Sequence, residues 1–364
     1  MFYLMLTYFP ILKNSTAEMN ALQQLKPTTK TSVIPIIESK VIKSSNQTEW
    51  WQTFRTLGSY LSQKVDGIKF IYDFMPAFSE IGEASESMVC PDTKNLISHC
   101  TNKLEEAALD YIPCVHFDSP DWIINSVIQT TTSNEIAIRI RCHDFNSPME
   151  DFIIERINEK IIRVAPSKNF YIILDFSNVA INQTRISNSI TNFSRLQHSH
   201  MILALSNCPG DAARVSPLTF DIADARIDFQ TYVHLKETFP ALHFGDYTVR
   251  IKGEPDQNAN IDYYNTYLKI FYTTEDNYMI GKSALLKNNG IETFISICQE
   301  IVDSDVYKSQ QFSNGDHAIK QCADEILKIT NHQKPIEFGI NHHIELVADQ
   351  LQHQVAMPVQ SRQF

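Results

Sequence analysis

The chain has few glycines and lacks the motifs in which glycine brings the backbone close to a phosphate. Only 10 of its 364 residues are glycine, and neither a G-x-G-x-x-G sequence nor a complete P-loop occurs. Gly281-Lys282-Ser283 matches the end of a P-loop, but Asp276 stands where the first glycine is required. The sequence therefore argues against Rossmann dinucleotide binding and against Walker-type hydrolysis of nucleoside triphosphates.

Positive charge and long apolar runs are also scarce. The 31 Lys and Arg residues face 42 Asp and Glu residues, which gives a net charge of -11. An acidic protein repels a phosphate backbone unless its basic residues are clustered, so nonspecific nucleic-acid binding is not expected. No apolar run reaches the roughly 18 residues that span a bilayer, so no membrane partner is expected.

The cysteine pattern and the N-terminus both indicate a cytoplasmic protein. The seven cysteines are odd in number and dispersed, with no C-x-x-C pair for zinc or dithiol chemistry. The N-terminal sequence MFYLMLTYFPILK is apolar, but it has no basic n-region and no small-residue cleavage site. We interpret it as a first strand and expect a reducing compartment.

Short runs of β-branched and aromatic residues alternate with longer segments of helical period. Eight runs are strand candidates: 6–12, 33–39, 69–74, 111–117, 135–141, 170–176, 201–206 and 242–249. Helix candidates lie between them: 17–25, 49–63, 94–109, 121–129, 150–164 and 184–193. Eight strands with intervening helices in roughly 250 residues predict an α/β fold, a TIM-like (β/α)8 barrel. An open doubly wound sheet is the structural alternative.

The pattern changes after residue 250. A polar segment with Gly and Pro is followed by two short strands, 267–272 and 277–282, which flank Thr-Thr-Glu-Asp as a β-hairpin. Helical segments follow. We therefore predict a barrel over 1–250, a hairpin and C-terminal helices over 251–354 packed on the barrel, and a flexible tail over 355–364.

Alternate residues of a barrel strand face the axis, and active sites lie where these residues approach the carboxyl ends. The strand at 135–141 has isoleucine at alternate positions, which leaves Arg139 and Arg141 facing the axis. In 111–118 the inward face carries His116 and Asp118. The same alternation directs five further ionisable residues to the centre: Lys13, Glu38, Lys40, Asp73 and Asp175.

Six of the eight strands thus place an ionisable group on the inner face. Buried charges cost several kcal/mol each unless they are paired, and this set contains both signs. We predict a polar ligand site at the mouth of the barrel. For any single member, an ordinary ion pair at a strand end is the alternative.

The residue types favour hydrolysis of an anionic small molecule or nucleotide. His116 beside Asp118 can act as a general base, and Arg139 and Arg141 can hold a phosphate or carboxylate through bidentate contacts. Lys13, Lys40 and Asp73 are further predicted substrate contacts. Phosphodiester or N-glycosidic cleavage is the resulting hypothesis. Glu38 and Asp175 are further catalytic candidates. Two carboxylates that flank a sugar would instead fit glycoside hydrolysis.

No cofactor is identified by the sequence. Carboxylates with one histidine can bind a hard divalent cation, but metal-ligand spacings such as H-x-H or H-E-x-x-H are missing from the strand ends. A divalent cation therefore stays an open alternative. Cys114 lies two residues before His116, where side chains are about 7 Å apart, so we interpret it as a core thiol.

Short motifs along the chain resemble the bacteriophage "beta protein" family of the phage T4 type, which also occurs in bacterial genomes. They are Tyr8-Phe9-Pro10-Ile11-Leu12-Lys13, Ile34-Pro35-Ile36-Ile37-Glu38, Gly245-Asp246-Tyr247, Phe312-Ser313-Asn314-Gly315-Asp316 and Gly339-Ile340-Asn341-His342-His343-Ile344. The resemblance covers nearly the whole chain and rests on the order of the motifs. It implies a phage or host-defence setting and no particular reaction.

The late motifs add candidate residues. Asp246 and Tyr247 end the eighth strand candidate and could join the mouth; a simple turn is the alternative. Asp316 is expected to cap a helix. Asn341-His342-His343 is expected to begin an apolar-periodic helix. Since adjacent residues do not share a helical face, at most one histidine is expected to face a site, and His342 is the candidate.

In a noncatalytic alternative, the same charged residues bind a protein partner and perform no reaction. In it, the chain is a recognition or adaptor component of a phage-defence system that binds a phage or host protein. Four tyrosines around the hairpin could supply such an interface, namely Tyr263, Tyr264, Tyr267 and Tyr272. Packing beneath the hairpin is the other interpretation of these rings.

Overall fold

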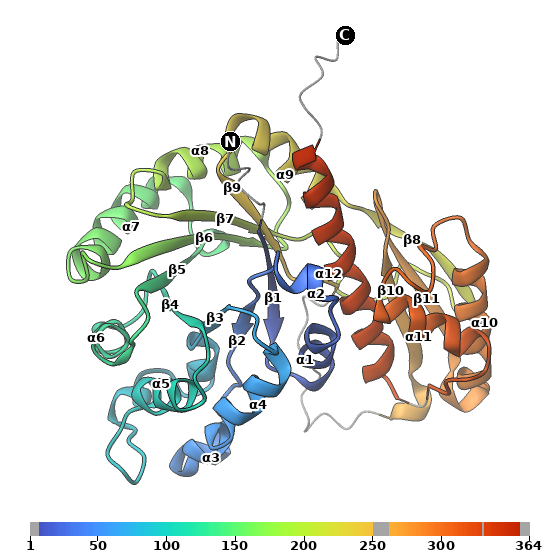
Figure 1. Cartoon of the computed structure of the whole chain (residues 1–364), viewed down its shortest axis with the longest axis horizontal. Coiled ribbons are helices and arrows are strands. Elements are labelled where there is room, and N and C mark those ends of the chain that lie inside the picture. The colour runs from blue at the N-terminus through green and yellow to red at the C-terminus, as the bar shows by residue number, and fades with distance from the viewer. Residues whose placement is uncertain (1–6, 250–261, 330, 357–364) are drawn as a thin grey trace.

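The computed structural model describes residues 7–249, 262–329 and 331–356. Eight parallel strands close into a barrel, with β9 pairing back on β1 (Figure 1). The strands are β1 Tyr8–Lys13, β2 Ile36–Glu38, β3 Phe70–Asp73, β4 Tyr111–His116, β5 Glu135–Arg141, β6 Asn169–Ser177, β7 His200–Leu205 and β9 Leu242–Asp246. The predicted (β/α)8 fold is confirmed, and each strand candidate overlaps a strand of the barrel.

Helices surround the barrel. They are α1 Thr16–Gln23, α2 Pro27–Lys30, α3 Trp51–Phe54, α4 Leu57–Val65, α5 Leu96–Glu106, α6 Asp121–Thr130, α7 Glu150–Ile157, α8 Gln183–Phe193 and α9 Ile227–Thr238. The helix expected over 49–63 is broken into α3 and α4. The helix expected over 150–164 changes to a π-helical turn at Asn158–Ile162.

The strand alternation separates two apolar layers. Ile136, Ile138 and Ile140 are fully buried in the layer between the strands and the helices. Ala137, from the opposite face of β5, joins Phe9 and other residues in a separate cluster inside the barrel. Arg139, two residues beyond Ala137, therefore lies on the inner face. This is the parity that the sequence predicts.

A second unit is built on a three-stranded antiparallel sheet, in the order β10 Tyr267–Thr273, β11 Asn277–Leu285 and β8 Thr219–Ala225. The helices α10 Gly290–Asp303 and α11 Asn314–Ala323 pack with it. The predicted hairpin is confirmed as β10 and β11. β8 lies within residues 1–250, however, so the expected boundary at 250 does not separate the two units. Residues 250–261 and 357–364 lie outside the described residues, the latter including most of the expected tail.

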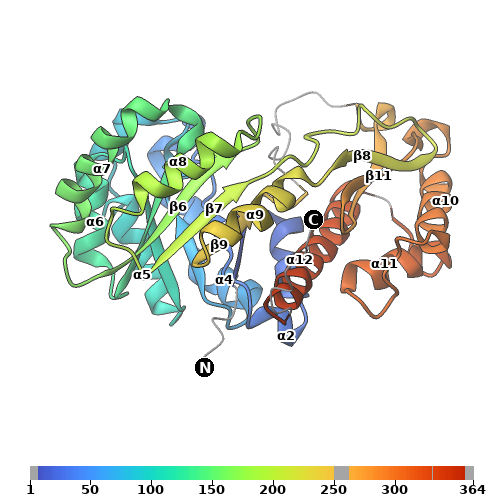
Figure 2. The same ribbon diagram turned by 90° about the horizontal axis from the view of Figure 1, so that it is seen from above.

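The long helix α12, Gln333–Ala356, lies between the barrel and the second sheet (Figures 1 and 2). Its Asn341 amide donates to the Ala21 carbonyl at 3.0 Å and accepts from the Gly315 amide at 2.8 Å. The helix thus contacts both α1 and α11. It begins at Gln333 and not at Asn341, which lies in mid-helix and forms these tertiary contacts. Within the described residues, no helix has both the length and the apolarity needed to cross a membrane.

The start of α11 is fixed by a side-chain cap and by close packing. Ser313, and not Asp316, is the N-cap, since its hydroxyl accepts from the Asp316 amide at 2.9 Å. A Cβ atom added to Gly315 would lie 2.2 Å from the Phe338 carbonyl oxygen of α12. Two late motifs of the sequence therefore meet where α11 contacts α12.

Candidate functional site

Arg139 lies inside the barrel at the carboxyl end of β5 and faces acceptors from three other strands and from the segment after β9. Its Nη1 is 2.9 Å from Glu38 Oε1 and 2.7 Å from Asp73 Oδ2. Its Nη2 is 2.7 Å from the Tyr247 hydroxyl and 2.8 Å from Asp175 Oδ2, and its Nε is 2.9 Å from the same Asp175 oxygen. Every guanidinium nitrogen therefore has a protein partner, and Arg139 organises the carboxylates.

The barrel register explains this meeting of side chains. Lys13 pairs with Glu38, and Glu38 pairs with Asp73, across β1, β2 and β3. His116 of β4 pairs with Arg139 of β5. Neighbouring strands therefore bring ionisable side chains to one level of the barrel. Lys13 Nζ completes the network at 3.2 Å from Glu38 Oε2.

His116 is paired with Asp73 rather than with Asp118. Its Nε2 lies 2.8 Å from Asp73 Oδ2, and its side chain is only 5 % exposed. The structure differs from the expectation because β4 ends at His116, where the Ser119 amide donates to the His116 carbonyl and the chain turns. Asp118 lies beyond this turn, is exposed, and pairs with Arg141 Nη2 at 2.8 Å.

One ring nitrogen of His116 is left without a contact. Nδ1 is buried and has no hydrogen-bond partner among the described residues. Buried polar atoms are nearly always satisfied in folded proteins, and an exception calls for an explanation such as a bound water, an ion or a catalytic role. Because Nε2 is held by a carboxylate, Nδ1 is the nitrogen available to a ligand.

The network carries more negative than positive charge. Burial alone would raise the pKa of Asp73, but His116 and Arg139 lower it more, so the pKa lies well below its ordinary value. For Arg139, burial lowers the pKa, but Tyr247, Asp175, Glu38 and Asp73 raise it well above its ordinary value. The three carboxylates of the network therefore face two cations, Lys13 and Arg139, whenever His116 is neutral.

Other predicted residues lie at the rim of the mouth or outside it. The Arg141 side chain is 35 % exposed and bonds to Asp118 and Asp144. Lys40 is exposed, with Nζ 5.5 Å from the centre of the Tyr60 ring, since β2 ends at Glu38 and the alternation stops there. Arg141, Asp118 and Lys40 are thus separate from the buried network.

Tyr247 joins the mouth, but Asp246 faces the other way. The Tyr247 hydroxyl donates to Asp175 Oδ2 at 2.7 Å. Asp246 is fully buried on the helix side of β9, where it accepts from the Tyr8 hydroxyl at 2.5 Å and contacts His343 Nε2 at 2.9 Å. The motif therefore supplies one residue to the mouth and one to the contact with α12.

His342 does not line the mouth. Its Nδ1 lies 2.8 Å from Asp316 Oδ2 of α11, and its Nε2 lies 2.7 Å from the Thr273 carbonyl oxygen of β10. His342 and His343 are both fully buried. The choice of His342 as a residue of the mouth is wrong, because α12 is covered on two sides, by the barrel and by the second unit, and His342 contacts the second unit.

Two groups of described residues have donor atoms placed to bind a metal ion. Asp73, Cys114 and His116 form the first group, and all three are buried at the mouth. Cys90, Asp92 and His99 form the second, near the start of α5. In each group the donor atoms lie within 4.8 Å of one another. The sequence interpretation of Cys114 as a core thiol missed the first group, because Asp73 approaches Cys114 from the neighbouring strand.

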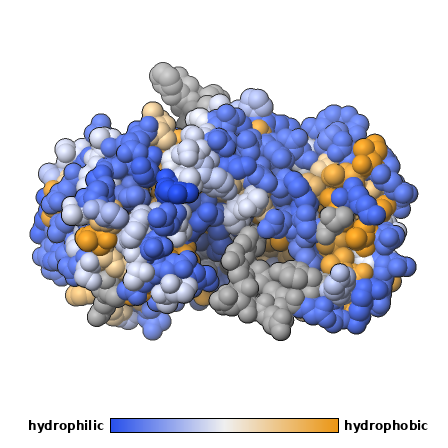
Figure 3. Space-filling view, turned by 90° about the horizontal axis from the view of Figure 1, so that it is seen from below, coloured by the Kyte–Doolittle hydropathy of each residue, from blue (hydrophilic) through white to orange (hydrophobic). Residues whose placement is uncertain are grey.

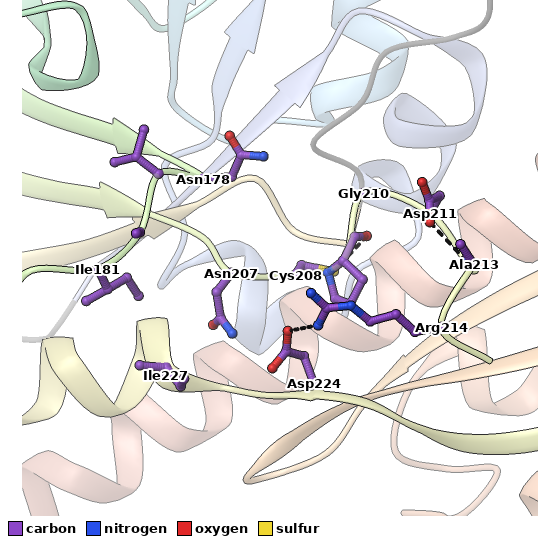
Figure 4. Close-up of a pocket in the computed structure, with 13 residues that line it drawn as sticks. Asn178, Ile181, Asn207, Cys208, Gly210, Asp211, Ala213, Arg214, Asp224 and Ile227 are labelled. Carbon is purple, nitrogen blue, oxygen red and sulfur yellow. Dashed lines mark hydrogen bonds and ion pairs between the residues drawn. The ribbon is translucent and has the colours of Figure 1, made fainter.

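A cavity of about 600 Å³ opens where β6 and β7 end (Figure 4). It is lined by the loops after these strands and by the junction of β8 and α9. It begins at Asn178, three residues after Asp175. Arg214 reaches across it and pairs with Asp224 at 2.5 Å. The loops after β6 and β7 therefore line a hollow whose one cation among the described residues, Arg214, is paired with an aspartate, and sequence alternation gave no signal for it.

Comparisons with known proteins support a family assignment and no function. No curated protein matches the chain significantly. One solved structure with some similarity is a psychrophilic glycoside hydrolase family 10 endo-beta-1,4-xylanase, at 9 % identity and a TM-score of 0.27, over 66 % of this chain and 86 % of the other. The sequence model of the Beta protein family matches residues 8–349. The chain therefore belongs to the Beta protein family.

Proposed function

We propose that the barrel is a hydrolase that acts on a nucleotide or another anionic small molecule, with His116 as general base. The observation that carries this proposal is the buried His116 ring, which has Nε2 on the Asp73 carboxylate and Nδ1 without a partner. A carboxylate that holds one imidazole nitrogen orients the ring and stabilises it when the other nitrogen accepts a proton.

The charge distribution determines how such a substrate would lie. Glu38, Asp73 and Asp175 would repel a phosphate placed beside His116, and Arg139 has no free donor with which to offset them. Neutral hydroxyl groups of a sugar could instead donate to these carboxylates. The anionic group then belongs at the rim, where Lys13 is 29 % exposed and Arg214 is 65 % exposed.

The test is a screen of the purified full chain against nucleotides, cyclic nucleotides, sugar phosphates and NAD, with and without Mg²⁺ or Mn²⁺. On a substrate that turns over, His116→Gln should lower kcat by about a hundredfold or more, because general base catalysis contributes that much. The fold should persist, since glutamine is polar and of similar reach.

His234→Gln is the matched control. His234 lies in α9 with its side chain 65 % exposed, so this variant should keep full activity. Unchanged kcat in His116→Gln would remove His116 as the base. A screen without any turnover would favour the noncatalytic alternative.

That alternative has its own supporting observation. Leu218, Ile222 and Ile227, in or next to β8, are each about half exposed. β8 is an edge strand of the described three-stranded sheet, and its one neighbour there is β11. Figure 3, the view from below, shows further apolar surface at the end of the molecule that carries the second unit. A strand with an exposed apolar edge can accept a partner strand. We propose recognition of a phage or host protein as the second candidate function.

The tyrosines around the hairpin support this candidate less than expected. Tyr272 is buried, whereas Tyr264 is 74 % exposed. The side chain of Tyr263 lies outside the described residues. Ile222→Asp should abolish copurification of a partner from phage-infected cells, and His116→Gln should not. Copurification that survives Ile222→Asp would contradict binding through β8.

We also propose a cytoplasmic location and a phage or antiviral-defence setting. All seven cysteines are free and buried, which suits a reducing compartment. The setting rests on the resemblance of the sequence motifs. Fractionation of cells that express the tagged chain, and a plaque assay with and without it, test the two statements separately.

A further inference from the structure

We propose that Asp73, Cys114 and His116 bind one divalent transition-metal ion, with zinc as the best match. The three side chains offer one oxygen, one sulfur and one nitrogen donor within 4.8 Å of one another. Thiolate, imidazole and carboxylate are the ligands that zinc takes in proteins, and three protein ligands leave a fourth position open.

The barrel register places these donors together. Asp73 of β3 pairs directly with Cys114 of β4, and His116 follows two residues later on the same inner face. All three side chains are nearly or fully buried. A site built on two paired strands is rigid, and its dry surroundings strengthen the binding of an ion.

His116 supplies the observation that points to a ligand. Its ring is almost fully buried, yet Nδ1 has no hydrogen-bond partner among the described residues. The other ring nitrogen, Nε2, lies 2.8 Å from Asp73 Oδ2, so an ion bound between these two donors would take the place of the proton that they share. Asp73 Oδ1 accepts one bond, from the Met75 amide, and keeps a lone pair for an ion.

The charge of the mouth fits a dication. Glu38, Asp73 and Asp175 carry three negative charges, and Lys13 and Arg139 carry two positive ones. Metal binding would release the thiol proton of Cys114 and add a fourth negative charge. An ion of charge +2 would then balance the set at four charges of each sign.

The second donor group lacks this charge deficit. The Asp92 carboxylate already pairs with Lys94 Nζ at 2.9 Å, and the Asp92 side chain is 55 % exposed. His99 is only partly buried. The group at Cys90, Asp92 and His99 therefore serves as the internal control for the group at the mouth.

This inference rests on the proposed use of the mouth as a ligand site. With an ion bound to His116, a water on the open fourth position would be the base in place of the imidazole. The test measures metal binding and not turnover. The full chain is stripped of metal and titrated with Zn²⁺ against a chromogenic chelator, and then with Co²⁺ alone. We expect one ion per chain and a thiolate-to-cobalt charge-transfer band. Cys114→Ala should abolish the band, and both Cys114→Ala and His116→Gln should weaken Zn²⁺ binding by at least a hundredfold.

Cys90→Ala is the matched variant and should leave the affinity and the band unchanged. Thermal unfolding of each metal-free variant shows whether it has folded. If the wild-type chain binds no Zn²⁺ under these conditions, or if Cys90→Ala loses the band while Cys114→Ala keeps it, the proposal is overturned. If the chain binds the metal but hydrolyses no substrate, the metal site is supported and only the proposed hydrolase function is contradicted.

Discussion

Arg139 and Asp175 form a buried ion pair in which Nε and Nη2 approach the same oxygen, Oδ2, at 2.9 and 2.8 Å. Asp175 Oδ1 accepts from the Ser177 amide at 2.8 Å. Both side chains are held inside the barrel, and Tyr247 donates to the shared oxygen. The pair therefore fixes the geometry of the mouth.

Replacement of Arg139 by methionine should strongly destabilise the fold. Methionine preserves much of the volume but leaves Glu38, Asp73 and Asp175 without their common partner. Removal of one member of a buried charge pair costs about 3–5 kcal/mol. Urea denaturation at neutral pH should show a loss of that size in the free energy of unfolding.

Arg195→Met is the matched control. The Arg195 side chain is 54 % exposed and pairs with the exposed Asp151. Exposed pairs contribute about 0–1 kcal/mol, so this variant should unfold nearly like the wild type. Equal, small losses in both variants would show that the network at the mouth is not a structural element.

Ile138→Ala tests the apolar layer between strands and helices. Ile138 is fully buried, so its truncation should cost about 2–5 kcal/mol through lost burial and a cavity. Ile326 is 72 % exposed, and Ile326→Ala should change the free energy of unfolding by less than about 0.5 kcal/mol. A loss below that limit for Ile138→Ala would contradict its place in the core.

The barrel was predictable because its strands are regular and locally encoded. Strand β5 has isoleucine at every second position, and this alternation alone orients Arg139. β8 gave no such signal. Its sequence, TFDIADA, carries Asp221 and Asp224, and its partner β11 comes about 55 residues later in the chain. A pattern within one short segment does not predict pairing between strands that are so far apart in the sequence.

The helix α9 was missed for a related reason. Its buried face includes Asp228 and Thr231, which interrupt the apolar period. Asp228 is buried because the Tyr278 hydroxyl and the Asn207 amide donate to it at 2.6 and 3.0 Å. These partners come from other elements, so a single helical segment does not reveal them.

The site was predictable only up to the strand ends. Lys13, Glu38, Asp73, His116, Arg139 and Asp175 were oriented correctly by alternation. Lys40 and Asp118 were not, since the chain turns before both. Alternation also predicts only which face of the sheet a side chain lies on. It does not predict which residues of neighbouring strands lie side by side, so it could not identify Asp73 as the partner of His116.

Gly315→Ala tests the contact between α11 and α12. The new Cβ would lie 2.2 Å from the Phe338 carbonyl oxygen, and a backbone atom cannot move aside cheaply. Overpacking of this kind costs about 1–3 kcal/mol, and we expect the upper end of that range. Limited proteolysis should then cut the second unit faster than in the wild type.

Gly67→Ala provides the comparison for this variant. Gly67 has φ +79° but nothing within 4 Å of an added Cβ. Its substitution should therefore cost only the backbone strain of the left-handed conformation, about 1–2 kcal/mol, and leave the proteolysis of the second unit unchanged. If Gly315→Ala also costs only about 1–2 kcal/mol and leaves the proteolysis of the second unit unchanged, the inferred close contact between α11 and α12 is wrong.

His243 should make the stability depend on pH in the mildly acidic range. Burial, His200 and Lys236 lower the pKa of His243 to about 4, whereas an unfolded histidine titrates near pH 6.5. Between about pH 4 and 6.5 the unfolded chain binds the proton and the folded chain does not, so stability rises with pH across this window. The gain in the free energy of unfolding is at most about 3 kcal/mol and is complete above pH 6.5.

Urea denaturation at several pH values should show this rise in the wild type and in His234→Gln, and a smaller rise in His243→Leu. An equal rise in His243→Leu would assign the effect to other groups. The buried Asp246 and Asp316 do not confuse the result: burial raises their pKa values, but His343 and His342 lower them further, so their stabilising effect is lost only below about pH 4.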